Sequence, residues 1–188
     1  EQLGVPVLAM VRPLQAQEGT GVDALQVHKA PDAIESESFR TLRTALAFSG
    51  GDVSRLVISS SEPGDGKTTV LANLAASYAK TGRKTLMIDG DMRRPGLTTL
   101  FGLRNETGLS DLLKSQDDLM EMCSQRIYAT EIEGLDILPS GPQPSNPSEL
   151  LHNPRLGDLF SWVETVYDQV LIDTPPVLAA SDAAIIGR

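Results

Sequence analysis

An apolar run, a glycine-containing loop and a helical pattern follow one another in residues 55–82, and this order constrains the fold more than any other feature. The run RLVI at 55–58 predicts a short buried strand. The stretch SSSEPGDGKTT covers 59–69. After it, apolar residues recur at the spacing of one helix face, and Gly82 predicts the helix end. The residues of this face are Leu71, Leu74, Ala75 and Tyr78.

The glycine loop contains the residue types that bind phosphate. Glycines let backbone N–H groups close around phosphate oxygens, and the following helix N-terminus adds partial positive charge. Lys67 would reach the β- and γ-phosphates, and the Thr68 hydroxyl would ligate Mg²⁺. The common pattern GxxxxGK[ST] has glycine where this chain has Ser61, so a tight turn that only caps the helix is the alternative for this stretch alone. The candidate nucleotide-binding residues are Gly64, Asp65, Gly66, Lys67, Thr68 and Thr69.

Apolar runs and helical patterns alternate along the rest of the chain. Further strands are predicted in 83–91, 134–141 and 167–176, and further helices from Ile34 to the Gly50–Gly51 pair, in 107–115 and from Asn146 onward. Asn146, Pro147 and Glu149 resemble a helix cap. Near-continuous apolar strands separated by helices indicate a mostly parallel sheet covered on both faces, an α/β fold of the P-loop NTPase type.

The first 33 residues differ in character from the rest of the chain. The run VPVLAMV at 5–11 predicts an edge strand or tether, and the polar residues after it predict a loose segment. We expect residues 34–188 to form one domain. Because the chain stops where another strand and helix would be expected, we also expect this domain to be truncated at its C-terminus.

Acidic residues follow two of the apolar strands. Asp89 ends one strand with Asp91 two positions later, and Asp173 ends another. Ligands of such sheets bind at the carboxyl ends of the strands, so these carboxylates are expected beside the glycine loop. Carboxylates gathered there need compensation, which Mg²⁺ carried by ATP would supply. For Asp89 and Asp91 alone, the alternative is a polar loop in which these acids pair with Arg93 and Arg94.

Composition excludes several classes. The chain has 16 basic and 25 acidic residues, a net charge of −9, which argues against nucleic acid as the main partner. Its single cysteine, Cys123, cannot form an internal disulfide, and His28 and His152 lie in dissimilar contexts without a catalytic or metal-binding pattern. No apolar run is long enough for a membrane helix, so the chain as given is expected to be soluble and cytoplasmic.

Several motifs in order resemble the cytoplasmic domain of bacterial tyrosine kinases that govern capsular and extracellular polysaccharide synthesis. They are SSSEPGDGKTT as Walker A, LMIDGDMRRP as Walker A′, VLIDTPP as Walker B, ESFRTLR upstream, and LPSGPQPSNPSELL. The resemblance covers nearly the whole chain. It implies ATP and Mg²⁺ as cofactors and autophosphorylation on tyrosine in trans, within a homo-oligomeric ring.

The resemblance also implies roles for individual residues. Lys67, Asp89 and Asp91 are the catalytic candidates, with Asp89 as the acceptor of the tyrosine proton. Thr68, Asp89, Asp91 and Asp173 are the metal candidates. Glu37, Arg40 and Arg43 form an ExxRxxR pattern expected on a helix face away from Phe39, Leu42 and Leu46. In the family this pattern mediates subunit contacts, although an exposed charged face with internal ion pairs is the alternative reading.

Departures from the family pattern matter as well. The family's C-terminal tyrosine cluster is absent, since the tyrosines are Tyr78, Tyr128 and Tyr167. The resemblance implies a membrane-spanning polysaccharide co-polymerase domain as partner, in the same or a separate chain, and an inner-membrane anchor for the parent protein. Two alternatives stay open: a nucleotide-gated assembly module without catalysis, and a partition-type ATPase. Glu62 stands where partition-type ATPases carry an extra lysine, which disfavours the second.

Overall fold

A five-stranded sheet forms the centre of the computed structural model, which describes residues 6–14, 19–49, 53–180 and 182–187. The strand order is β1-β5-β2-β4-β3, and all neighbouring pairs are parallel except β3 with β4. The strands are β1 (Arg55–Ile58), β2 (Thr85–Asp89), β3 (Tyr128–Ala129), β4 (Leu135–Leu138) and β5 (Gln169–Asp173). This arrangement confirms the predicted α/β fold with a mostly parallel sheet.

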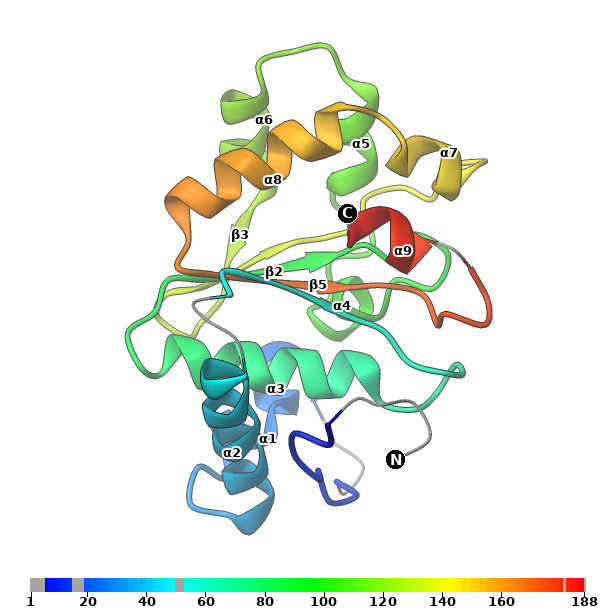
Figure 1. The fold of residues 1–188 in the computed structure, drawn as a ribbon. Coiled ribbons are helices and arrows are strands. Elements are labelled where there is room, and N and C mark those ends of the chain that lie inside the picture. The colour runs from blue at the N-terminus through cyan, green and yellow to red at the C-terminus, as the bar shows by residue number, and fades with distance from the viewer. Residues whose placement is uncertain (1–5, 15–18, 50–52, 181, 188) are drawn as a thin grey trace.

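Helices cover both faces of the sheet (Figure 1). One face carries α5 (Leu109–Lys114), α6 (Leu119–Arg126), α7 (Pro147–Leu151), α8 (Arg155–Val166) and α9 (Asp182–Ile186). The other carries η1 (Gly21–Ala24), α1 (Gln26–Lys29), α2 (Ile34–Phe48), α3 (Lys67–Ala79) and α4 (Gly96–Leu100). The central strands β2 and β5 are buried at every position, which explains why their sequences are apolar without alternation.

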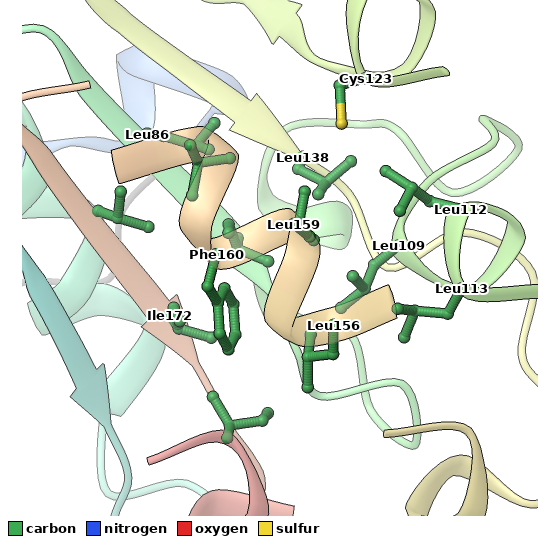
Figure 2. Packing of buried hydrophobic residues seen from close by; sticks show 14 of the residues in the cluster. Leu86, Leu109, Leu112, Leu113, Cys123, Leu138, Leu156, Leu159, Phe160 and Ile172 are labelled. Carbon is green, nitrogen blue, oxygen red and sulfur yellow. The ribbon is translucent and has the colours of Figure 1, made fainter. Parts of the chain in front are cut away.

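Alternate residues of each central strand point into different cores. Leu86 and Ile88 of β2 belong to the core under α8, whereas Met87 belongs to the core under α3. Figure 2 shows the first of these cores, where Leu159 and Phe160 of α8 lie among side chains of the sheet and of α5. The sheet is therefore held between two separate apolar layers, as expected for strands with a two-residue side-chain period.

The helix after the glycine loop is enclosed more fully than its sequence pattern predicted. All positions of α3 from Leu71 to Ala79 are buried, because the sheet covers one side and α2 with α1 covers the other. Asn73, at a buried position, is accommodated by hydrogen bonds: its Oδ1 accepts from Val27 N at 2.9 Å, and its Nδ2 donates to the Thr69 carbonyl at 2.9 Å. The small residues of α3 let the covering segments approach closely.

In the residues described, the edge strand predicted for the N-terminal segment and part of the loose segment were wrong, whereas the alternative of a tether stays a prediction. Residues 6–11 contain no strand. Within the predicted loose segment, residues 21–29 form the short helices η1 and α1. This segment is anchored by apolar residues that are spaced irregularly among polar ones. They are Val22, Leu25 and Val27, which are buried in the core under α3. Residues 1–5 and 15–18 of the predicted tether lie outside the described part.

The remaining elements differ from expectation in smaller ways. The helix expected from Asn146 is two helices, α7 and α8, because residues 152–154 interrupt it; its cap is confirmed, with Asn146 Oδ1 accepting from Glu149 N at 3.4 Å. The strand β3 and the helices α4, α6 and α9 were not predicted. Helix α2 begins at Ile34 as predicted and ends at Phe48, and the Gly50–Gly51 pair lies outside the described residues. Within the residues described, no helix combines the length and apolar character needed to cross a membrane.

We predict that Leu159→Ala lowers the free energy of unfolding by about 3 kcal/mol, because Leu159 is fully buried between the sheet and α5. Denaturant unfolding monitored by circular dichroism measures the change. Leu178→Ala is the matched control, since Leu178 is 78% exposed and should change stability by less than about 0.5 kcal/mol. Equal losses for the two variants would contradict the placement of α8.

We also predict a slow thiol reaction at Cys123. The side chain is buried, and burial raises its pKa to about 11, from an ordinary value of 9.0. Because a higher pKa leaves less thiolate, the reactive fraction at pH 8 should be about 100-fold below that of an unperturbed cysteine, in addition to steric protection. Colorimetric disulfide exchange at pH 8 should be fast only in denaturant. A fast reaction in the native protein would contradict the burial of α6 against the core.

Candidate functional site

The polar candidate residues meet where β1, β5 and β2 end. These strands are neighbours, and their registers place Ile58, Asp173 and Asp89 at the same level. The loop that follows β1 and the residues that follow β2 therefore leave the sheet side by side. This is the edge at which ligands of parallel α/β sheets bind.

The conformation of the glycine loop explains why the serine at position 61 is compatible with it. Gly64 and Gly66 have φ of +95° and +87°, a region that side chains strongly disfavour, and Gly66 caps α3. Among the described residues no other type has a positive φ, so Ser61 needs no glycine. Asp65 stabilises the loop internally, because its Oδ2 accepts from Glu62 N at 2.9 Å. The loop thus keeps its glycines where the backbone requires them.

The ammonium group of Lys67 lies between two buried carboxylates. Its Nζ is 3.0 Å from Asp173 Oδ1 and 3.3 Å from Asp91 Oδ2. Thr68 joins the same cluster, since its hydroxyl donates to Asp173 Oδ2 at 2.5 Å. Burial alone would lower the pKa of Lys67, but the charges of and hydrogen bonds to Asp173 and Asp91 raise it, so the ammonium is fully charged at neutral pH. Burial raises the pKa of Asp173, and Lys67 opposes this effect.

Asp89 lies directly behind this cluster and is fully buried. Its Oδ2 accepts two hydrogen bonds of 2.7 Å, from Thr98 N and Thr98 Oγ1, and its Oδ1 accepts from Asp91 N at 3.2 Å. Burial raises the pKa of Asp89 to about 7, which outweighs the opposing effect of the Thr98 hydrogen bonds. Thr98 also accepts from Ser140 N at 2.9 Å, which ties β2 to the end of β4. Nothing in the spacing of the sequence pointed to Thr98 or Ser140.

A glycine brings α4 against the phosphate-binding loop. A Cβ on Gly96 would lie 2.5 Å from Thr68 Oγ1, so only glycine allows this approach. The contact places the first turn of α4 beside the hydroxyl predicted to bind metal, and Thr98 of the same helix reaches Asp89. Gly96 therefore connects the glycine loop with the segment that follows Asp91.

A pocket of about 540 Å³ opens over the cluster. Its walls come from the glycine loop, from the residues after β2 and from the loop after β5. The lining residues are Pro63, Gly64, Gly66, Lys67, Thr68, Thr69, Asp91, Arg93, Arg94, Pro175, Pro176 and Ala179. Asp89 and Asp173 do not line it. The structure therefore brings Lys67, Thr68 and Asp91 to the pocket surface, places Asp173 directly behind them, and hides Asp89 beneath Thr98.

Arg93 is held by a residue far along the chain. Its Nε donates to Asp182 Oδ2 at 3.3 Å and its Nη2 to Ser148 Oγ at 2.7 Å, while Ser148 Oγ donates to Asp182 Oδ1 at 2.6 Å. Asp182 itself is fully buried. This network fixes one wall of the pocket to α7 and α9. The alternative in which Asp and Arg pair within one loop did not predict this long-range contact.

The residues present fit a Mg²⁺ ion delivered with a nucleotide. The oxygens of Asp91, Asp173 and Thr68 are close together, and oxygen ligands from one or two carboxylates, a hydroxyl and phosphate are those that Mg²⁺ prefers. The described residues contain no group of three or more His, Cys, Asp or Glu that could hold a metal without such help. The predicted inclusion of Asp89 among the ligands, and its role as proton acceptor, stay predictions.

The three residues of the ExxRxxR pattern do not share one environment. Arg40 Nη1 lies 2.8 Å from Glu37 Oε2, and 40% and 59% of these two side chains are exposed. Arg43 instead faces α3, where Nη1 donates to the Ser77 carbonyl and, at 2.9 Å, to Ser77 Oγ. The prediction that all three point away from the core is therefore wrong for Arg43, because a long side chain on this helix reaches the neighbouring helix. The subunit-contact role of the pattern stays a prediction.

Fold and site together define a P-loop nucleotide-binding protein, with a glycine loop before a helix and an acid at the end of a neighbouring parallel strand. The family model described as AAA domain matches residues 54–186. Among curated proteins, the putative tyrosine-protein kinase CapB of Staphylococcus aureus is 37% identical over 175 residues, which are 92% of this chain and 75% of CapB. The putative tyrosine-protein kinase AmsA of Erwinia amylovora is 46% identical over 84% of this chain, but this match spans only 22% of AmsA.

Solved structures similar to this chain also include tyrosine kinases. The chimerical protein CapA2B2 matches with a TM-score of 0.85 at 40% identity, over 99% of this chain and 77% of that one. The kinase domain of the Escherichia coli tyrosine kinase ETK matches with a TM-score of 0.80 at 39% identity, over 87% and 64%. The septum site-determining protein MinD of Pyrococcus horikoshii, complexed with Mg-ADP, matches less well, with a TM-score of 0.57 at 31% identity over 70% and 52%. The chain belongs to the bacterial tyrosine-protein kinase family.

We predict that Lys67→Met destabilises the protein by about 3 kcal/mol at pH 8 without nucleotide or metal, because it leaves the buried carboxylates of Asp91 and Asp173 without their cation. The loss should be smaller at pH 5. Removing Lys67 raises the pKa of Asp173, and a carboxyl whose folded pKa is raised loses stability as pH rises. Thermal unfolding with chelator measures both values, and Lys114→Met on an exposed position is the control. An unchanged unfolding temperature at pH 8 would contradict the pairing.

Proposed function

We propose that this chain transfers the γ-phosphoryl group of ATP to tyrosine side chains of protein, in trans and within an oligomer. The observation that carries the proposal is the Lys67 ammonium between two buried carboxylates at the floor of a pocket formed by a phosphate-binding loop. Family membership supports tyrosine as the acceptor, since the similar proteins CapB and AmsA are named tyrosine-protein kinases.

In this mechanism the loop binds the nucleotide through backbone N–H groups around Gly64 and Gly66 and at the start of α3. Lys67 moves from its carboxylates to the β- and γ-phosphates, where its charge offsets the negative charge that spreads over the transferred group. Thr68, Asp91 and Asp173 would hold Mg²⁺, which supplies further charge neutralisation when bound. Because the two carboxylates beside Lys67 already bind one cation, their side chains need little rearrangement to bind another.

The reaction exchanges one P–O bond for another. The tyrosine oxygen forms a bond to the γ-phosphorus, the bond from that phosphorus to the bridging oxygen breaks, and ADP leaves with the electron pair. The phenolic proton passes to a carboxylate. We propose Asp89 for this role, reached through the Thr98 hydroxyl that donates to its Oδ2, while Asp91 faces the pocket directly.

The positions of the tyrosines support transfer between molecules. No tyrosine lines the nucleotide pocket or a second pocket that lies between α4, the segment after β2 and the loop after β4. Tyr78 and Tyr167 are buried, and the Tyr167 hydroxyl donates to Asp136 at 2.8 Å. Tyr128 hydroxyl donates to Glu106 at 3.1 Å. Within a homo-oligomeric ring, the exposed pair of Glu37 and Arg40 is the proposed contact between subunits.

The wider setting follows from the family resemblance. We propose that the chain acts with a membrane-spanning polysaccharide co-polymerase domain, in the same or a separate chain, at the cytoplasmic side of the inner membrane. Its phosphorylation state would then regulate synthesis and export of capsular or extracellular polysaccharide. The competing functions are a nucleotide-gated assembly module and a partition-type ATPase, and both lack tyrosine phosphorylation.

We predict that the chain, incubated with γ-labelled ATP, Mg²⁺ and a tyrosine-containing polypeptide, places base-stable label on tyrosine. Lys67→Met should reduce the rate by about 100-fold or more, because the transferred charge loses its fixed cation. Lys114→Met, the same change on an exposed position, should leave the rate unchanged. Phosphoamino-acid analysis gives the readout. ATP hydrolysis without label on tyrosine would instead support the ATPase alternative.

A further inference from the structure

A second pocket adjoins the nucleotide pocket. It has a volume of about 540 Å³ and lies between the segment after β2, helix α4 and the loop after β4. Arg94 lines both pockets, so they share a wall. The lining includes Thr98, whose hydroxyl donates to Asp89, and its accessible apolar surface comes from Pro95 and Pro142, since Met92 is buried in the core. None of the roles assigned above uses this second pocket as a binding surface.

The second pocket is cationic, although the chain as a whole is acidic. Among the residues that the structure describes, its lining contains Arg94 and Arg104 but no aspartate or glutamate. Among the described residues, neither guanidinium forms an ion pair; the one hydrogen bond of the Arg104 side chain runs from Nε to Thr99 Oγ1, at 3.2 Å. Both residues are exposed. The nearest carboxylate, that of Asp91, accepts from Arg94 N at 3.0 Å and belongs to the nucleotide pocket. In a chain of net charge −9, two arginine side chains without an ion-pair partner in one pocket form a local site for an anion.

The position of the second pocket identifies the kind of anion. The nucleotide phosphates already have a loop, a lysine and a helix N-terminus in the first pocket, whereas the second pocket lies on the other side of residues 92–96. A tyrosine that attacks the γ-phosphorus has to approach near Asp91, and its chain needs a surface to lie on. The second pocket offers apolar contacts for a ring and two guanidinium groups for acidic side chains beside it.

We propose that the pocket of Arg94 and Arg104 binds the acceptor polypeptide and selects tyrosines that have carboxylate side chains next to them. The identity of the bound polypeptide as a phosphate acceptor rests on the proposed kinase function. The preference for acidic peptides is inferred separately, from the charge and position of the pocket. Arg104 is a specificity-determining residue in this view. Arg94 contributes to both pockets.

Binding can be measured without catalysis. The probes are two fluorescent peptides of identical sequence with phenylalanine in place of tyrosine, one with glutamates and the other with glutamines on both sides of it. Fluorescence anisotropy with the full 188-residue chain and a non-hydrolysable Mg-ATP analogue should give about fivefold tighter binding of the glutamate peptide. Arg104→Gln should remove this preference, because it removes one guanidinium without disturbing a buried contact.

Lys114→Gln, which removes an exposed positive charge elsewhere, is the matched control and should keep the preference. Rates of phosphorylation of the corresponding tyrosine peptides form the second readout, and Arg104→Gln should raise KM for the acidic peptide about fivefold without changing KM for ATP. A thermal unfolding temperature equal to that of the unmodified protein establishes that each variant is folded.

The outcomes separate the two proposals. Equal binding of the two peptides, or an unchanged preference in Arg104→Gln, overturns the acceptor pocket even where tyrosine is phosphorylated. Competition between the nucleotide analogue and the glutamate peptide also overturns it, because it assigns the arginines to nucleotide binding. A preference that depends on Arg104, with no phosphorylation of any peptide, supports the binding pocket and refutes the kinase function.

Discussion

The ammonium of Lys67 compensates a group of carboxylates that the sheet buries together. Asp173 ends β5, Asp89 ends the neighbouring β2, and Asp91 follows two residues later. All three side chains are removed from water, and each uncompensated charge there would cost several kcal/mol. One cation, Lys67, and a set of hydrogen bonds compensate these charges. The glycine loop, the order of strands and the position of α4 all serve to keep these groups in contact.

The three carboxylates have different surroundings. Asp173 and Asp91 both contact Lys67, and Asp173 also accepts from the Thr68 hydroxyl; in the proposed mechanism these two acids exchange Lys67 for a metal ion. Asp89 is bound by Thr98 and the backbone of Asp91 and has no direct contact with Lys67 in the part of the chain described. The same motif therefore contributes one residue to the pocket surface and one to the layer that supports it. Thr98 connects the two layers, because it belongs to the lining of the second pocket and to the hydrogen-bond set of Asp89.

The sequence was sufficient for the four parallel strands and the glycine loop, since both depend on local pattern. Buried parallel strands are continuous apolar runs, and Gly64 and Gly66 stand where a positive φ is required. It was insufficient where contacts join distant segments. The burial of Val22 and Leu25 depends on α3, the orientation of Arg43 depends on Ser77, and Arg93 depends on Asp182 at the far end of the chain. The two-residue strand β3 is too short for any periodicity to reveal it.

The distribution of charge in the two adjoining pockets follows from the same constraint. At the nucleotide pocket, Lys67 is balanced by acids from within the chain, and in the proposed mechanism a phosphate group replaces those acids as its partner. At the second pocket no acid among the described lining residues balances Arg94 and Arg104, so the proposed ligand supplies the negative charge. Because the three tyrosines of the chain line neither pocket, the ligand that we propose for the second pocket is an acidic acceptor segment from another polypeptide. Binding of such a segment would place its hydroxyl group beside residues 91–98, the stretch that already organises Asp89 and the glycine loop.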